Sequence, residues 1–400
     1  MSNTIDSPLL LNRVLGSSLR AFKRALLPIS AFSTVYRREP LQGTDTIAVP
    51  YYPLNGNTSG TRAAGGSYAA LAGNTSVGSR SITPTRNKVQ AISFTTEELN
   101  RQPAFDPEMH GMLIGEKLAY DVLDDILRVI SAGRYTGDTI TASTAANFDE
   151  GDVADLGVKC DDAYWPEGDR SLILRPAFGF NLLKQAAIID ASQYGSTDGI
   201  RDAKIPRLLG FNVFRNAGVP TNVGITEVAT ANATTNVVTN TTNAYPLRDL
   251  DRVRFTTTNT LPAGLSVDTD YYVFAADVSA GTFKVATTAA NAVAGTQVDI
   301  TDTGTGTHSV TRREDLGGFA VTRSAILTAF APLTPSRAMQ SQLADYQVVE
   351  DDDSDLTIEY KHIVYPDTNK EVQVIECNYG VAYGEVAALK RIEDATLRAV

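Results

Sequence analysis

The sequence predicts an α+β fold into which a small all-β domain is inserted. Residues 106–133 have the apolar spacing of one long helix. Strand, helix and strand patterns follow one another from Ser171 to Arg215, whereas residues 225–311 contain almost only short alternating strands. The mixed pattern resumes after residue 311, so we interpret the all-β stretch as an insertion.

The N-terminal residues 1–43 are expected to form an arm that begins with an amphipathic basic helix. Leu11, Leu15, Phe22 and Leu26 share one face, and Pro28 ends the pattern. The cations that lie mostly off this face are Arg13, Arg20, Lys23 and Arg24. A membrane surface, organelle targeting and packing on protein could each use such a helix. Its apolar run is too short for a membrane span, and we expect packing on protein.

Residues 44–96 predict a β-hairpin with a very long loop. Strand-like segments at both ends, around Val49 and over Val89 to Phe94, flank a stretch rich in Gly, Ser, Asn and Ala. Ordering such a loop costs ~1–2 kcal/mol per backbone residue, and it has little apolar surface to bury against itself. We therefore expect it to be mobile or held by another molecule.

The long helix is expected to start at Asp106 as N-cap and to end at Gly133. Its predicted apolar face holds Met112, Ala119, Leu123, Ile126 and Ile130. The opposite stripe carries opposite charges four residues apart, at Lys117, Asp121, Asp124 and Arg128. At this length the helix is expected to be a spine along which other elements lie.

Two further patterns concern the strands. In the all-β stretch, Val253 and Phe255 are expected to face the core while Arg252 and Arg254 face water. Residues 347–389 predict two long antiparallel strands with a turn at residues 367–369. Before the insertion, Gly210 is expected to allow a turn between its leucines and the following strand.

No residue pattern in the chain predicts catalysis or a bound cofactor. Cys160 and Cys377 lie far apart in the sequence, and the three histidines have no partner at ligand spacing. The acidic run at residues 350–355 fails as a calcium loop, because Leu356 and His362 occupy the positions that need glycine and glutamate. Phosphate-binding and nucleophile motifs do not occur. We therefore expect a non-enzyme without metal or cofactor.

The order of these parts resembles the Hong Kong 97-like fold of the major capsid (coat) proteins of tailed bacteriophages. The stretches that carry the resemblance are LPISAFSTVYRREPLQGTDTIAVP, SLILRPAFGFNLLK followed by IPRLLGFNVFRNAGVP, GGFAVTRSAILTAFAP, and NYGVAYGEVAALKRIED. The resemblance implies an N-terminal arm (1–43), an extended loop (44–96), a peripheral domain with the spine helix (97–150 and 345–400), an axial domain (151–224 and 312–344) and an inserted β domain (225–311). The insert resembles the Ig-like modules of phage structural proteins.

The resemblance also implies a function and a set of partners. Subunits would assemble through hexamers and pentamers into an icosahedral shell around double-stranded DNA, forming a virion in the bacterial host cytoplasm. A separate scaffolding protein, a portal protein and a possible decoration protein would be its other partners, with no membrane involved. The net charge of −11 argues against a surface that is basic all over, so DNA would meet only a local basic face. The expected interaction residues are Arg13, Arg20, Lys23, Arg24, Arg37, Arg38, Arg62 and Tyr68.

Two other functions stay open. An encapsulin-like protein nanocompartment shell is the first alternative, distinguished by protein cargo in place of nucleic acid. The second is a secreted β-rich adhesin, which the missing signal-peptide pattern and the flanking α/β pattern oppose. The only lysine of the expected extended loop is Lys88, near its base, so covalent cross-linking between subunits is not expected.

Overall fold

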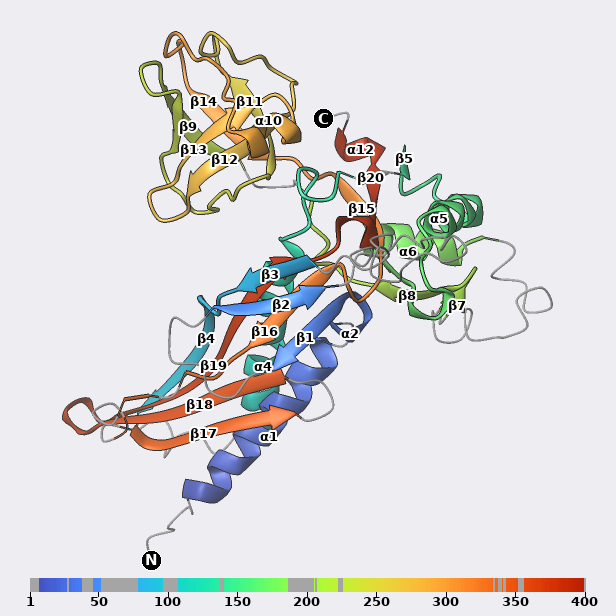
Figure 1. Cartoon of the computed structure of the whole chain (residues 1–400). Helices are drawn as coiled ribbons and strands as arrows, with labels where there is room; N and C mark the ends of the chain where they lie inside the picture. Colours follow the sequence, from blue (N-terminus) through green and yellow to red (C-terminus); the bar gives the residue numbers. More distant parts are fainter. Residues whose placement is uncertain are drawn as a thin grey trace, which may run out of the picture. The chain divides into compact units, whose positions relative to one another are not determined.

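The chain forms two compact units in the computed structural model (Figure 1). Unit 1 runs to Val129 and includes Arg323–Glu385, and unit 2 holds Ile130–Thr322 and the segment from Val386 onward. Both units mix helices and strands, so the predicted α+β class is confirmed. The structure describes residues 7–26, 29–37, 46–51, 78–95, 107–136, 140–185, 205, 207–221, 226–333, 335–336, 340, 343–351 and 356–398.

Unit 1 is built on a six-stranded sheet in which β19 is the longest strand. Five of its strands follow one another in the order β1 (Ser33–Arg37), β16 (Ile326–Phe330), β19 (Lys370–Tyr383), β18 (Leu356–Tyr365) and β17 (Leu343–Asp351). The sixth strand, β4 (Arg86–Thr95), also pairs with β19. Tyr379 of β19 pairs with both Phe330 and Arg86, so β16 and β4 lie on opposite sides of β19.

The predicted long antiparallel pair is confirmed as the hairpin β18–β19. A short 3-10 turn, η3 (Pro366–Thr368), connects the strands, and Asn369 completes it with a φ of 53°. Asparagine tolerates this left-handed conformation better than most residues, which explains its place in the turn.

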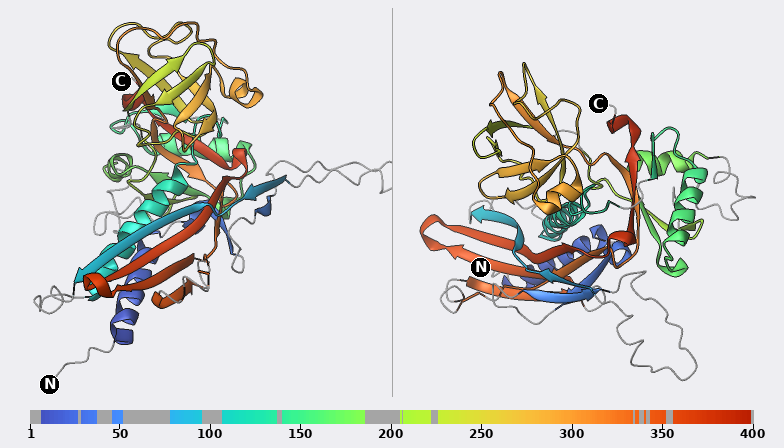
Figure 2. Two further views of the ribbon diagram at one scale, coloured as in Figure 1. Left: turned by 90° about the vertical axis from the view of Figure 1, so that its left-hand side faces the viewer. Right: turned by 45° about the horizontal axis from the view of Figure 1, so that its top comes forward.

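The spine helix α4 (Pro107–Leu127) packs against β4 and β19 (Figure 2). Alternate side chains of β4 reach it, since Arg86 Nη1 lies 2.8 Å from Asp125 Oδ2 and Gln90 Nε2 donates to Asp121 Oδ2 at 3.1 Å. Helix α4 begins at Pro107, next to the predicted N-cap, although residue 106 itself lies outside the described residues. It ends at Leu127 and not at the predicted Gly133, because residues 128 and 129 already form a turn. One face of α4 is therefore held against the sheet of unit 1.

The arm helix α1 (Ser7–Ala25) packs along α4 of the same chain. Phe22 and Leu26 are buried, as predicted for the apolar face. Gly115 of α4 allows this close approach, because a Cβ atom there would lie 2.2 Å from the backbone oxygen of Ser18. The short helix α2 (Ile29–Phe32) then leads into β1.

The expected extended hairpin has a different second strand from the one predicted. Strand β2 (Ile47–Tyr51) pairs with β3 (Gly78–Ile82), and Ile47, Val49 and Ile82 are buried against β16. The 89–94 segment instead belongs to β4 and pairs with β19 over ten residues. The prediction failed because the alternating pattern of 89–94 fits any half-buried strand and does not specify its partner. Residues 52–77, between β2 and β3, lie outside the described residues.

Unit 2 contains a second six-stranded sheet. Its strands follow the order β5 (Ile140–Ser143), β20 (Leu389–Asp394), β15 (Leu316–Val321), β6 (Ser171–Leu174), β8 (Phe211–Arg215) and β7 (Arg207–Leu208). Its helical segments are α5 (Glu150–Asp162), η2 (Glu167–Asp169), α6 (Pro176–Leu183), η4 (Val386–Ala388) and α12 (Ala395–Arg398). Strands β6 and β8 are parallel, which confirms the predicted strand–helix–strand order.

The β7–β8 hairpin explains the predicted glycine turn. Leu209 and Gly210 have φ angles of 47° and 86°, the two positive values that a tight type I′ turn requires. Gly210 therefore has the expected role. Leu209 lies at the tip of the turn and is exposed.

A closed β-barrel occupies the chain from Thr226 to Arg312 within unit 2. Its strand order is β10 (Val237–Asn240), β13 (Thr282–Ala286), β12 (Tyr271–Asp277), β11 (Arg252–Thr257), β14 (His308–Arg312) and β9 (Thr226–Asn232), and the helix α10 (Ala289–Ala294) follows β13. Strand β9 pairs with both β10 and β14, which closes the barrel. This closure corrects the expected Ig-like topology, in which two separate sheets face each other.

The side chains of β11 follow the predicted alternation only in part. Val253 and Phe255 are buried in the barrel core, as expected. Arg252, which was expected to face water, is only 3% exposed. Its guanidinium lies among carboxylates from distant parts of the chain.

Two strands belong to a different sheet from the one that the expected domain boundaries imply. Strand β20 was expected with the long strands, yet it pairs with β15 and β5 of unit 2. Strand β16 was expected in the axial part, yet it pairs with β1 and β19 of unit 1. Both are short strands whose residues are all buried, and short sequences such as ILTAF and LKRIED do not specify which sheet a strand joins.

Candidate assembly surface

A groove lies between the arm helix α1 and the spine helix α4 in unit 1. Its cavity has a volume of about 340 Å³ and is lined by Ser17, Arg20, Ala21 and Arg24 from α1 and by Met112 and Glu116 from α4. Helix α1 positions its lining residues through Phe22, which is completely buried. The groove is therefore lined by both polar and apolar side chains, with the exposed Arg20 and Arg24 at its rim.

An apolar stripe on α4 continues the groove along the helix surface. Its members, which we call the α4 stripe, are Met109, Met112, Leu113 and Tyr120, with exposed fractions between 47% and 61%. Their spacing places them on one helix face. Other apolar residues of α4, such as Leu118 and Val122, are completely buried in the subunit. A helix with apolar residues on more than one side is typical of a buried helix, so the stripe has the character of a contact surface.

The polar groups around the stripe are already paired along the helices. Tyr120 donates its hydroxyl to Glu116 Oε1 at 3.2 Å, and Lys117 Nζ lies 2.6 Å from Asp121 Oδ1. Burial and the Glu116 carboxylate raise the pKa of Tyr120, and the positive charge of Arg24 opposes this. Arg20 donates from Nε to the backbone oxygen of Gly16 at 3.1 Å. The groove rim therefore presents cationic groups beside an uncharged phenol.

Of the eight expected interaction residues, the structure brings Arg20 and Arg24 together at this groove, both exposed. Lys23 lies on α1 and is half-buried. Arg13 lies in α1 and Arg37 in β1, but their side chains are not among those described. Arg38, Arg62 and Tyr68 lie outside the described residues.

The α4 stripe itself was not predicted. Met112 was placed on the buried face, but it is 47% exposed. Met109, Leu113 and Tyr120 were not singled out, although their spacing of four and seven residues was present in the sequence. The signal was missed because α4 has two apolar faces, and the pattern of one face hides the other.

A second group of titratable side chains lies within the sheet of unit 1. Glu359 of β18 pairs directly with Glu376 of β19, and Lys361 contacts both carboxylates. Glu359 accepts hydrogen bonds from the Leu333 amide and the Tyr346 hydroxyl. Burial raises the pKa of Glu359 to about 7, with the Leu333 hydrogen bond opposing and the Glu376 charge adding to the shift. This carboxyl group titrates near neutral pH inside the sheet.

Other features bear on catalysis and membrane binding. Both cysteines are free and buried, and burial raises the pKa of Cys160 to about 12 and that of Cys377 above its usual range. Their thiols therefore stay protonated and unreactive near neutral pH. The described residues contain no group of three histidine, cysteine or acidic residues able to hold a metal. No helix in the described part of the chain is long and apolar enough to cross a membrane.

Comparison with known proteins finds similarity in structure alone. No protein-family model and no curated protein matches the sequence. The chain is similar to the capsid of cyanophage P-SCSP1u, with 12% identity, coverage of 91% of this chain and 86% of the other, and a TM-score of 0.48. It is also similar to the mature capsid of bacteriophage PhiM1, with 10% identity, coverage of 92% of this chain and 86% of the other, and a TM-score of 0.42. The virus-like particle from Pyrococcus furiosus is 9% identical, with coverage of 96% of this chain and 98% of the other, and a TM-score of 0.41.

Proposed function

We propose that this chain is a major capsid protein of the tailed-bacteriophage type, with a Hong Kong 97-like fold. Its subunits assemble through hexamers and pentamers into an icosahedral shell that encloses double-stranded DNA. The chain acts as a structural protein without catalytic activity or cofactor. Its proposed assembly partners are a separate scaffolding protein and a portal protein, and a decoration protein is a further candidate. Its proposed location is the virion, which is assembled in the host cytoplasm.

The α4 stripe is the observation that carries the proposal. A single subunit leaves Met109, Met112, Leu113 and Tyr120 in water on its spine helix. Burying such side chains between subunits stabilises each contact by ~1.5–3 kcal/mol per large apolar residue. Many equal contacts then stabilise a closed lattice, even where each contact is weak.

The arm and the loop have proposed roles in the same lattice. Arg20 and Arg24 stand at the rim of the groove, where they can pair with acidic groups of a neighbouring subunit or with DNA phosphates. Arg13, Lys23, Arg37, Arg38, Arg62 and Tyr68 are proposed to contribute to subunit contacts as well. The proposed parts of the subunit are the arm 1–43, the loop 44–96, the peripheral part 97–150 and 345–400, the axial part 151–224 and 312–344, and the insert 225–311. Within these ranges, we assign β16 to the peripheral part and β20 to the axial part, because of the sheets to which they belong.

Substitution of the most exposed leucine of α4 tests this proposal. Leu113→Gln removes apolar surface from the stripe, and Leu113 is 59% exposed, so the fold of the subunit is expected to stay intact. Losing about 1.4 kcal/mol per contact corresponds to tenfold weaker association. We expect particles to form only at about tenfold higher subunit concentration, measured by light scattering and sedimentation.

Val293→Gln is the matched control, because Val293 is an apolar residue of α10 in the barrel that is 74% exposed. It should leave assembly unchanged. Equal assembly of Leu113→Gln and the parent chain would remove the stripe from the proposed interface.

The cargo of native particles separates the two shell functions, since nucleic acid supports a virus capsid and protein cargo supports an encapsulin-like compartment.

A further inference from the structure

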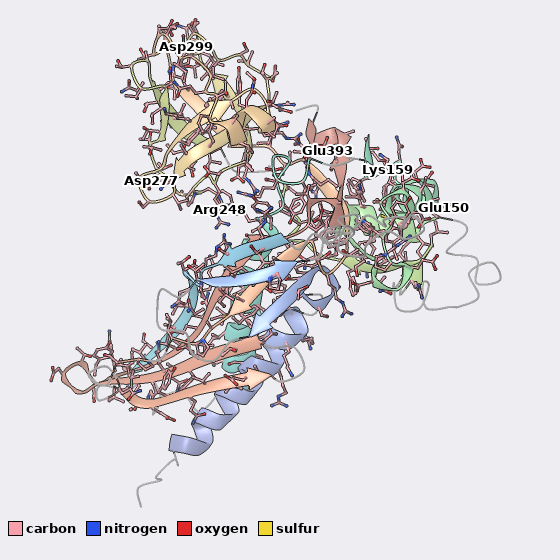
Figure 3. All side chains as sticks on the ribbon, in the orientation of Figure 1. Glu150, Lys159, Arg248, Asp277, Asp299 and Glu393 are labelled. Carbon is pink, nitrogen blue, oxygen red and sulfur yellow. The ribbon has the colours of Figure 1, made fainter. Side chains whose placement is uncertain are left out.

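Helix α5 of unit 2 has an exposed face that carries both acidic and apolar side chains. The helix begins at Glu150 and has Lys159 in its last turn, and both residues are labelled in Figure 3. Asp155, Val158 and Asp162 are exposed, and their spacing of three and four residues places them on one side of the helix. Val158 is 58% exposed. We call these three residues the α5 face.

Tyr164, in the turn that follows α5, is an unusual residue for its position. Its φ angle is 56°, in the left-handed region that glycine or asparagine normally occupies after a helix. An aromatic residue in this conformation destabilises the free subunit. The side chain is also 76% exposed, so it gains little packing inside its own chain in return. Tyr164 therefore has the character of an anchor for a partner.

The charges of the α5 face and of the groove in unit 1 are opposite in sign and are not used inside the subunit. Among the described residues, neither Asp155 nor Asp162 forms an ion pair. No carboxylate in the described part of the chain lies within ion-pair distance of Arg20 or Arg24 at the groove rim. Two complementary surfaces are thus present on one chain.

We propose that the α5 face and Tyr164 of one subunit dock into the groove between α1 and α4 of a second copy of this chain. This contact rests on the proposed shell function, because it names the surface that covers the groove in the shell. The ring of Tyr164 enters the cavity beside Met112, and the carboxylate of Asp162 pairs with Arg24. Charge and apolar surface then match on both sides of the contact.

The groove has the chemistry that a tyrosine side chain requires. Its cavity of about 340 Å³ accommodates an aromatic ring. The sulfur of a methionine makes favourable contacts with such a ring, and a guanidinium group is attracted to its face. The α4 stripe continues the groove along the helix, which offers Val158 an apolar surface as well. Tyrosine and arginine are also the residues in which interface hot spots are enriched.

The contact joins two different surfaces, so it is heterologous. Heterologous contacts propagate head to tail and close into rings when the rotation between subunits allows it, whereas a two-fold contact pairs one surface with itself. Each subunit carries one groove and one α5 face, so it can bind two neighbours through this contact. Rings of five or six copies need a contact of this type.

Tyr164→Gly separates a role in assembly from a role in the fold. Glycine adopts a φ of 56° without strain, so the variant should unfold at no lower denaturant concentration than the parent chain. Loss of the ring should weaken association between subunits about tenfold, measured by sedimentation equilibrium. Association equal to that of the parent would overturn the contact. A less stable subunit would also overturn it, because the ring would then pack inside its own chain.

Charge reversal tests the ion pair. Arg24→Glu alone should raise the subunit concentration needed for association about tenfold, and adding Asp162→Arg should restore it, since every contact then holds a reversed pair. Asp299→Arg is the matched control, because Asp299 is an exposed carboxylate in the barrel segment, labelled in Figure 3. It should not restore association. Restoration by both second substitutions, or by neither, would overturn the pairing.

These measurements keep the contact apart from the shell function, because sedimentation detects association of subunits below the concentration at which particles form. Particles that form equally well in every variant would overturn the contact and leave the shell function standing. Subunits whose association depends on Tyr164 and Arg24, but which never close into shells, would support the contact and contradict the proposed function.

Discussion

Glu359 and Glu376 face each other on adjacent strands, and their neighbourhood makes the stability of unit 1 depend on pH. The pKa of Glu359 is raised from 4.5 to about 7, chiefly by burial. Since the folded state holds this proton more tightly than the unfolded state, the stabilisation is complete below about pH 4.5. It is lost as the pH rises towards 7, because the buried group must ionise.

Glu359→Gln should remove this pH dependence. The amide oxygen can still accept the Leu333 hydrogen bond, and no charge develops at high pH. We expect the variant to be about 1–3 kcal/mol more stable than the parent chain at pH 8, with little difference near pH 5. Denaturant unfolding of unassembled subunits at the two pH values measures the effect. A variant that is less stable at both would contradict the assigned protonation.

Arg252 shows what could and could not be predicted for a single residue. The alternation of β11 correctly placed Val253 and Phe255 in the barrel core. It placed Arg252 in water, whereas its guanidinium is buried beside Glu393, 141 positions along the chain. Local periodicity predicts which face a side chain takes, but it carries no information on partners that only the tertiary fold provides.

At the scale of elements, the contact between α1 and α4 depends on one glycine. A Cβ atom at Gly115 would lie 2.2 Å from the Ser18 oxygen, a backbone atom that cannot move without the helix. Gly115→Ala should therefore separate the two helices and destabilise unit 1 by about 1–3 kcal/mol. Denaturant unfolding and the exchange protection of residues 16–26 measure this change.

Gly16→Ala provides the matched control on the partner helix. A Cβ atom at Gly16 has no neighbour within 4 Å, so alanine should favour the helix by up to about 1 kcal/mol. Equal effects of the two substitutions would show that the close contact at Gly115 does not hold the helices together.

Elements were predicted well where the sequence pattern was long and poorly where pairing decided the outcome. The spine helix, the arm helix and the β18–β19 hairpin have strong patterns, and the structure confirms them. The predicted partner of β2 was wrong, because the true partner β3 is a short polar strand, GSRSI, with a weak sequence pattern. The strands of the barrel were predicted, but its closure was not, because closure depends on pairing between strands far apart in the chain.

At the scale of the whole molecule, the candidate assembly surface could be predicted only in part. The basic residues of the arm helix pointed to Arg20 and Arg24, which do line the groove. The apolar half of the surface, the α4 stripe, needed the structure, because only the fold shows which of the two apolar faces of α4 stays exposed. An exposed stripe on an otherwise well-packed helix is expected when the native state includes further copies of the chain.

Electron microscopy of the purified chain, alone and together with the proposed scaffolding protein, tests the central claim most directly. Uniform closed shells, or rings of five and six subunits, are the result that our account predicts. A chain that stays monomeric under all assembly conditions would contradict it.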